Sequence, residues 1–231
     1  MIVSIAQPAY LPWLGYFDRV AASDLHVVLD HVPLERSSTT RFTNRNKVRG
    51  PGGPLWLTVP VVGASRQPAI NAAEIDTTQG WQQRHRRTLE QAYGKTPHFA
   101  ALAGLLETSY GTPWTRLNDL LAVQRGWLLD ALGIGTRIVT SSQLGVPGSK
   151  SELILRLCEA VGATVYLSGP FGRDYLDASA FERSGIALRF HDYAHPVYPQ
   201  GSLPFEPYLS VVDLLAHHGA DSLRLLRTPP E

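Results

Sequence analysis

The first residues that could do chemistry lie in SIAQPAYLPWLGYF, residues 4 to 17, where a short apolar run ends at Gln7 and aromatic residues follow between prolines. The Gln7 amide can donate and accept hydrogen bonds beside the expected start of a helix, where unpaired backbone N–H groups favour an anion. Tyr10 and Trp13 would expose apolar surface unless something covers them. One interpretation is that Gln7 ties down its own loop while the rings pack. We favour the other interpretation, in which this junction between strand and helix binds a ligand.

A second group of polar residues lies in FTNRNKVR, residues 42 to 49, with Arg41 directly before it. Arginine binds carboxylates and phosphates through a bidentate fork, and asparagine amides can orient a polar substrate. We therefore expect Asn44 and Arg45 to contact a substrate. A solvated loop that carries charge by default remains the alternative.

The motif WQQRH places His85 four residues after Trp81, so both side chains share one face of a predicted helix, and Tyr93 lies two turns further on. Histidine changes its protonation state near neutral pH and often acts as an acid or base. A lone histidine is as often a satisfied structural residue. We keep both interpretations and expect Tyr93 to lie at the substrate.

Further candidates follow predicted strands in the second half of the chain. Ser142 ends one strand, and SGPFGRDYLD, residues 168 to 177, offers Gly169 in a turn together with Tyr175. A tight turn explains the glycines equally well.

The segment HDYAHPVYPQ, residues 191 to 200, gathers His195, Tyr198 and Gln200 in an irregular, proline-rich stretch that we expect to bind substrate. His191 and His195 are four residues apart, but no cysteine or third ligand joins them, so we expect no metal site. Motifs for phosphate-binding loops, dinucleotide sites and the serine-hydrolase elbow are missing.

Composition narrows the function. A net charge of +1 with 18% charged residues gives no basic field for nucleic acid. No segment reaches the roughly 20 apolar residues that span a bilayer, and the amino terminus lacks a leader pattern, so we expect a cytoplasmic protein with neither nucleic acid nor membrane as partner. The single cysteine, Cys158, lies in a helical pattern and is predicted to be buried and structural.

The elements that must position these residues begin with a strand at 2 to 6, a helix at 13 to 22 and a strand at 25 to 30. Such a unit has parallel strands, and open parallel sheets bind ligands at their carboxyl ends, where Gln7 and Asp30 fall. A long polar loop at 31 to 54 and a strand-like exit at 55 to 62 follow, with residues 68 to 76 expected to pair beside it.

Three helical patterns, at 79 to 93, 97 to 109 and 113 to 132, predict a helical insertion or cover over residues 78 to 132. Strand patterns then return within residues 135 to 144, 164 to 177 and 186 to 193, with helices at 150 to 161 and about 209 to 218. We predict one α/β domain over residues 1 to 231, with a doubly wound, mainly parallel sheet.

Taken together, QPAYLPWLGYFDRVAASD, FTNRNK before WLTVPV, the Trp81–His85 motif and YLSGPFGRDYLD before HPVYPQ resemble the WbqC-like family over nearly the whole chain. The resemblance implies a setting among genes for surface polysaccharides or natural products. In fold, residues 2 to 30 look like the entry unit of the HUP-type nucleotidylyltransferases, although the histidine pair that holds ATP in those enzymes is missing here.

The first functional hypothesis is a transferase that forms an amide, moving an acyl or aminoacyl group from a thioester or ester donor to an amino sugar or natural-product precursor. Such a donor, for example an acyl thioester of coenzyme A or of an acyl carrier protein, is already activated, so no further cofactor is expected. His85 would take the amine proton, Gln7 and Asn44 would orient the acceptor or stabilise the oxyanion, and Arg45 would bind an anion. The walls of the substrate pocket would be formed by Tyr10, Trp13, Tyr175 and Tyr198.

Two alternatives remain open. A HUP-type ligase or nucleotidyltransferase would use ATP or CTP, with the Arg41 to Arg49 segment in place of the missing histidines. A non-catalytic module would bind a sugar or a carrier protein for partner enzymes.

Overall fold

The computed structural model describes residues 1–35 and 42–228. At its centre is a five-stranded sheet in the order β5-β2-β1-β6-β7, in which all neighbours are parallel. The strands are β1 (Ile2–Ala6), β2 (Leu25–Val28), β5 (Arg137–Thr140), β6 (Val165–Ser168) and β7 (Ala187–Phe190). The prediction of an α/β protein with a mainly parallel sheet is confirmed.

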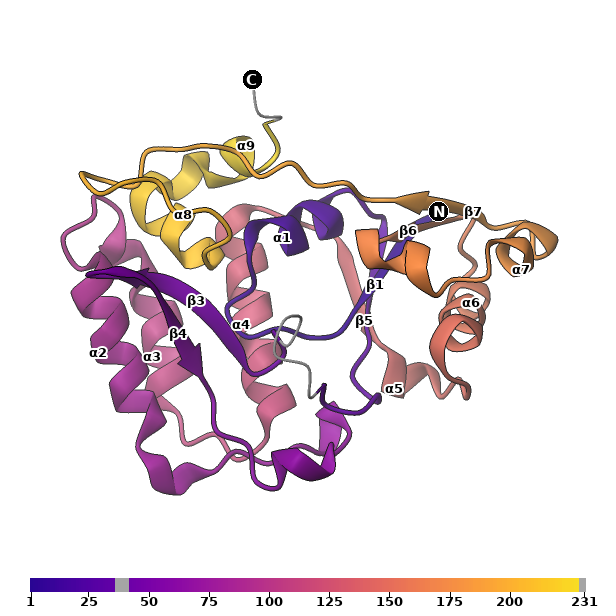
Figure 1. Cartoon of the computed structure of the whole chain (residues 1–231), viewed down its shortest axis with the longest axis horizontal. Coiled ribbons are helices and arrows are strands. Elements are labelled where there is room, and N and C mark those ends of the chain that lie inside the picture. The colour runs from indigo at the N-terminus through magenta and orange to yellow at the C-terminus, as the bar shows by residue number, and fades with distance from the viewer. Residues whose placement is uncertain (36–41, 229–231) are drawn as a thin grey trace.

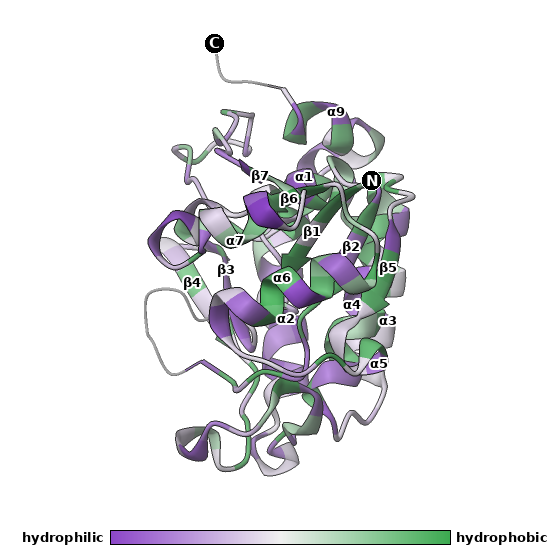
Figure 2. Ribbon diagram, turned by 90° about the vertical axis from the view of Figure 1, so that its right-hand side faces the viewer, coloured by the Kyte–Doolittle hydropathy of each residue, from purple (hydrophilic) through white to green (hydrophobic). Residues whose placement is uncertain are grey.

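One face of the sheet is covered by α6 (Lys150–Ala160) and α7 (Ala178–Arg183) (Figure 1). Val3 and Ile5 of β1 share a buried cluster there with Leu157 of α6 and Phe181 of α7. Strands of a parallel sheet are buried on both faces and are therefore apolar along most of their length, as the green β1 in Figure 2 shows.

The other face of the sheet is covered by α1 (Leu14–Ala21), and a buried histidine fixes it there. His26 of β2 is fully buried; its Nδ1 lies 2.8 Å from the Ser4 hydroxyl of β1, and its Nε2 lies 3.1 Å from the Tyr16 hydroxyl of α1. Burial, with Arg19 and Arg125 nearby, holds the His26 pKa well below its usual value. The neutral ring thus joins two strands and one helix.

A second body of structure packs beside α1. It comprises the helices α2 (Trp81–Tyr93), α3 (Ala103–Gly111) and α4 (Leu117–Leu132), the antiparallel hairpin β3 (Arg45–Gly50) and β4 (Gly53–Thr58), and α8 (Val211–His218) with α9 (Ser222–Leu226). Figure 1 shows the hairpin and α2–α4 on one side of the parallel sheet, with α6 and α7 on the other. Buried side chains from α1, the hairpin, α2–α4 and α8 form one continuous cluster.

The prediction of a loop from 31 to 54 was wrong for residues 53 and 54, which begin β4, and for residues 45 to 50, which form β3. Its polar side chains find partners inside the protein: Asn46 donates from Nδ2 to the Leu11 carbonyl at 2.6 Å. Residues 68 to 76 pair beside the strand-like exit, as predicted, only at an isolated antiparallel bridge between Val61 and Ile75; Ile70–Ala72 form a 3₁₀ turn. The helix expected at 97 to 109 begins as a 3₁₀ turn, Phe99–Leu102, and continues as α3 from Ala103.

Three short helices were not predicted: α5 (Ser141–Leu144), α7 and α9. Helices of four to six residues give too few periods of the hydrophobic pattern to be seen in a sequence.

Within the described part of the chain, no helix is long and apolar enough to cross a membrane. Cys158 is fully buried, as predicted, and burial raises the pKa of its thiol to about 12.

Helix α4 offers a matched pair for testing the core. Leu128 is fully buried whereas Val123 is 36% exposed on the same helix. We expect Leu128→Ala to lower the free energy of unfolding by about 2–5 kcal/mol, because it removes buried methyl groups and leaves a cavity. Val123→Ala should change it by less than about 1 kcal/mol. Urea unfolding followed by circular dichroism measures both, and equal losses would contradict this packing.

Candidate functional site

A cavity of about 590 Å³ lies at the carboxyl ends of β1 and β6. From β1 the chain builds outward through β2 to β5, whereas β6 and β7 extend the sheet in the other direction. The boundary between the neighbouring strands β1 and β6 is therefore the switch point at which open α/β sheets bind their ligands. The residues that line this switch-point cavity are Ile5, Trp13, Arg19, Phe42, Tyr166, Ser168, Gly169, Pro170, Phe171, Gly172, Tyr175 and Tyr208.

Six of the twelve lining residues are aromatic, and several of these rings face solvent. Phe171 is 68% exposed, Tyr208 51% and Tyr175 49%. Exposed rings gathered around one cavity mark a binding site, because each ring costs free energy in water that a ligand would recover. Trp13 and Tyr175, both predicted at the site, belong to this wall.

Tyr208 is held at the cavity in an unusual backbone conformation, with φ of 59°. Its N–H donates to Nε2 of His195 at 3.1 Å, and Nδ1 of His195 donates to the Pro196 carbonyl at 2.8 Å. Burial holds the His195 pKa below its usual value, which favours the neutral ring that can accept this hydrogen bond. His195 therefore stands behind the cavity wall and positions Tyr208.

Arg19 brings a positive charge into this aromatic cavity. Its guanidinium lies so close to the Gly169 backbone that a Cβ atom at Gly169 would collide with Nη1. The Nε atom is buried without a hydrogen-bond partner. Within residues 1–35 and 42–228, Arg19 forms no ion pair with a carboxylate. Arg19 is half-buried, and a cation partly withdrawn from water is stabilised when an anion joins it, so the cavity is suited to an anionic ligand.

Sequence reasoning missed Arg19. The residue follows an apolar run on α1 and looks there like an ordinary solvated arginine. The signal available in the sequence was Gly169, which sequence reasoning placed at the site and which the structure shows to be the residue against which the guanidinium packs.

A cluster of hydrogen-bonded polar side chains joins the carboxyl ends of β2 and β5. The Asp30 carboxylate accepts hydrogen bonds from the Ser141 hydroxyl at 3.0 Å, the Ser142 backbone N–H at 2.9 Å and the Ser142 hydroxyl at 2.7 Å. Nδ1 of His31 lies 2.6 Å from the Ser141 hydroxyl. Ser142, predicted at the substrate, thus helps satisfy a buried carboxylate and does not line the switch-point cavity.

His85 lies in the core between α2 and the loop after β1. It is 5% exposed, and its Nδ1 lies 2.8 Å from the hydroxyl of the fully buried Tyr10, which is itself 2.6 Å from the Tyr110 hydroxyl. Burial lowers the His85 pKa to about 4. The structure therefore places Tyr10 and His85 away from the switch-point cavity, with no exposed face on which a substrate amine could meet the imidazole.

Gln7, Asn44 and Arg45 are also bound within the protein. Gln7 accepts a hydrogen bond from the Thr43 hydroxyl at 3.2 Å, and Asn44 donates from Nδ2 to the Val59 carbonyl at 2.8 Å. The Arg45 guanidinium lies over the Trp56 ring, 4.3 Å from its centroid. Arg41, which we expected to bind an anion, lies outside the described residues.

The last three predicted residues meet around Arg49 and Asp213, between the hairpin and α8. Tyr93 accepts the Arg49 backbone N–H at 2.9 Å, Gln200 accepts from the Arg49 guanidinium, and Tyr198 donates to the Asp213 carboxylate at 2.9 Å. Burial raises the Asp213 pKa. This network is enclosed and binds the proline-rich segment to the hairpin.

A smaller cavity of about 210 Å³ lies where the chain leaves β7. It is lined by Asp18, His191, Asp192, Tyr193, Ala194, Leu226, Arg227 and Thr228. Nε2 of His191 lies 2.6 Å from an Asp18 carboxylate oxygen, so a histidine and a carboxylate share this wall.

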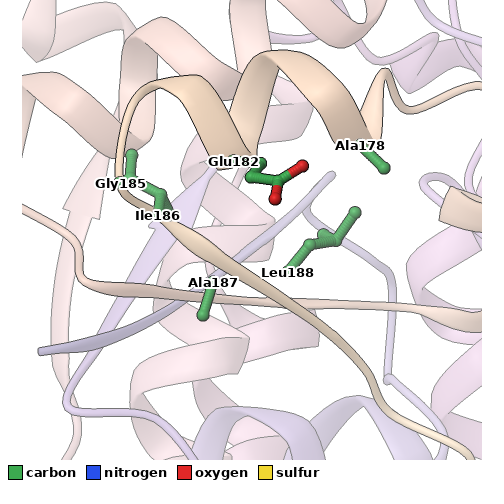
Figure 3. Close-up of a pocket in the computed structure, with 6 residues that line it drawn as sticks. All are labelled: Ala178, Glu182, Gly185, Ile186, Ala187 and Leu188. Carbon is green, nitrogen blue, oxygen red and sulfur yellow. The ribbon is translucent and has the colours of Figure 1, made fainter.

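A third cavity, of about 330 Å³, lies between α7 and β7 (Figure 3). Ala178, Ala187 and Leu188 supply apolar walls, and Glu182 is the one charged residue among those that line it. It flanks the start of the edge strand, away from the carboxyl ends, and brings no set of polar groups together.

Within the described ranges, no group of three or more His, Cys, Asp or Glu side chains could hold a metal ion.

The pKa of His85 predicts a pH dependence of stability. The folded value of about 4 lies below the unfolded value of about 6.5, so the unfolded chain binds more protons in between and the stabilisation is lost as the pH falls below about 6.5. From pH 7.5 to 5.0 we expect His85 to contribute a loss of about 2 kcal/mol. Urea unfolding of the wild type and His85→Gln at both pH values measures this contribution. Equal losses in the two proteins would contradict it.

Comparison with known proteins was consistent with the resemblance seen in the sequence. The model of the WbqC-like protein family matches residues 7–225. The chain is 34% identical over 228 residues to a Mycobacterium tuberculosis H37Rv protein named "Uncharacterized protein Rv1507c", with 97% of each chain covered. No solved structure matches. The protein described here therefore belongs to the WbqC-like protein family.

Proposed function

We propose that this protein is a transferase that holds an anionic, activated donor in the switch-point cavity and forms an amide between the donor's acyl or aminoacyl group and an amine. The acceptor would be an amino sugar or a natural-product precursor. The observation that carries the proposal is the position of Arg19, a cation without a carboxylate partner among the described residues, inside an aromatic cavity at the switch point.

The walls suit a donor that combines a negative group with a planar or apolar one. An arginine guanidinium binds phosphate or carboxylate oxygens through two parallel hydrogen bonds. Trp13, Tyr175 and Tyr208 supply ring faces and edges. Coenzyme A thioesters have both features, because they carry phosphates and an adenine. The cavity volume of about 590 Å³ lies in the range of sites for small molecules.

In the reaction, the amine nitrogen attacks the carbonyl carbon of the donor, the C–S or C–O bond breaks, and the thiol or alcohol leaves with the proton that the amine loses. Holding the two reactants in contact lowers the barrier by several kcal/mol, and removal of the amine proton by a base adds about 10²- to 10⁴-fold in rate. The enclosed His85 is badly placed for that role.

Two other functions are each favoured by one observation. A nucleotide-dependent ligase or nucleotidyltransferase fits the switch-point location, where α/β sheets commonly hold nucleotides, and the rings could stack on a base. A non-catalytic binding module fits the composition of the cavity wall, in which no histidine or carboxylate is found among the described residues. The ligand retained separates the first function from the second, and product formation separates both from the third.

Removal of the cation tests the binding site. We expect Arg19→Met to weaken binding of the anionic donor about 10- to 100-fold, since a hydrogen bond to a charged group contributes about 1.5–3 kcal/mol. Arg224→Met, at an exposed position on α9, serves as the matched control and should bind as the wild type does.

The measurement is native mass spectrometry against acetyl-coenzyme A, acyl-loaded carrier protein, ATP, CTP and nucleotide-linked amino sugars. Retention of the thioester, followed by amide formation when glucosamine is added, supports the transferase. Selective retention of ATP or CTP would favour the nucleotide-dependent enzyme. Unchanged binding in Arg19→Met would overturn the assignment of the cavity.

A substitution that keeps the charge but moves it gives an independent test. Gly169→Ala adds a methyl group that collides with Nη1 of Arg19, so the guanidinium must shift. The backbone of Gly169, with φ of −68° and ψ of 167°, accepts any residue, so we expect an unchanged melting temperature. Donor affinity, measured by isothermal titration calorimetry, should fall several-fold. Full affinity would show that the guanidinium position does not matter.

A further inference from the structure

His191 and Asp18 form a pair of the kind that enzymes use to hold a base. His191 follows β7, and its Nε2 lies 2.6 Å from Oδ2 of Asp18 on α1. When Nε2 carries the proton and donates it to the carboxylate, Nδ1 keeps a lone pair, and no described residue hydrogen-bonds to Nδ1. A carboxylate that fixes the tautomer and orientation of a histidine in this way stabilises the ring after it has taken a proton.

This pair lies directly beside the switch-point cavity. Ser168 and Phe190 are paired in neighbouring strands, and the His191 N–H donates to the Ser168 carbonyl at 2.8 Å, so His191 stands next to Gly169 across the sheet. Arg19, which packs on Gly169, is the residue after Asp18 on α1. The Trp13 ring of the large cavity lies 5.5 Å, edge to face, from the Tyr193 ring of the small one.

The small cavity has the chemistry of a site for an amine. Asp18, whose Oδ1 lies 3.8 Å from Nε of Arg227, and Asp192 supply carboxylate oxygens, and the Tyr193 ring supplies a π-face, which attracts cations. Asp192 is held by two hydrogen bonds from Arg173, at 2.8 and 2.7 Å. The side chains of His191 and Asp18 are 13% and 19% exposed, so both remain accessible from the cavity.

We propose that the small cavity receives the amine group of the acceptor and that His191, oriented by Asp18, removes its proton. This inference rests on the proposed function. The amine nitrogen bonds to the donor's carbonyl carbon, and its proton passes to Nδ1 of His191. The C–S bond then breaks, and the histidine returns the proton to the departing thiolate, so that His191 ends in its starting state.

The amine site is tested first on the unmodified protein, without any donor. Glucosamine is titrated in while the ring signals of His191 are followed by ¹H–¹⁵N NMR, with glucose as the matched probe that lacks the amine. We expect glucosamine to shift the His191 signals in a saturable way and glucose to leave them unchanged. No shift with glucosamine, or equal shifts with both sugars, would overturn the amine site. Because no donor is present, this result is independent of the proposed function.

The catalytic role is tested with His191→Gln and Asp18→Asn, with His98→Gln at an exposed position as the control. Retention of acetyl-coenzyme A should be unchanged in all three. Amide formation should fall about 10²- to 10⁴-fold in His191→Gln, and the pH–rate profile should change in Asp18→Asn. The other ionisable groups facing His191 are Asp192, Tyr193 and Arg227, and the profile is read against them. Turnover in His191→Gln within about threefold of the wild type would overturn the role of His191.

If the wild type retains no donor and forms no amide, the proposed function fails and the NMR titration alone decides the amine site. If the donor binds and amide forms but His191→Gln is fully active, the proposed function stands and this inference fails. Melting temperatures of the variants separate a lost step from a lost fold.

Discussion

The hydrogen bonds of one buried imidazole fix the geometry of this protein. His26 joins the Ser4 hydroxyl of β1 to the Tyr16 hydroxyl of α1, and it does so as a neutral ring in a place that water does not reach. Because α1 is only eight residues long, this anchor sets the direction of the whole helix. The direction of α1 in turn positions two residues near the carboxyl ends of the strands. Asp18 lies beside His191, and Arg19 packs against Gly169.

Several elements could be predicted from local patterns alone. The strand β1 is a short apolar run ended by Gln7 and Pro8, and α4 carries its leucines on one face. The strand β3 could not be found in this way, because RNKVRG has no apolar alternation. Its strand conformation depends on pairing with β4 and on contacts such as that between Asn46 and the Leu11 carbonyl, which join residues far apart in the sequence.

The candidate site shows the same division. Trp13, Gly169 and Tyr175 were expected at the site from their residue types at predicted strand ends, and they line the switch-point cavity. His195 supports the wall from behind, and the other predicted residues bind elsewhere in the protein. Sequence cannot separate these outcomes, because a histidine or tyrosine with neighbouring aromatic residues serves a core as well as a site. His85 illustrates this: its motif does not distinguish a hydrogen bond to Tyr10 from one to a substrate. Only the three-dimensional arrangement makes that distinction.

The position of Cys158 has a consequence for any thioester that this protein encounters. Thioesters exchange their acyl groups with thiolates, and a protein that exposes an ionised cysteine would acylate itself. The single cysteine of this chain is enclosed between α6 and the sheet, and its thiol, with a pKa of about 12, stays protonated at neutral pH. An acyl group carried on sulfur therefore meets no competing sulfur nucleophile here and is left intact for an external amine.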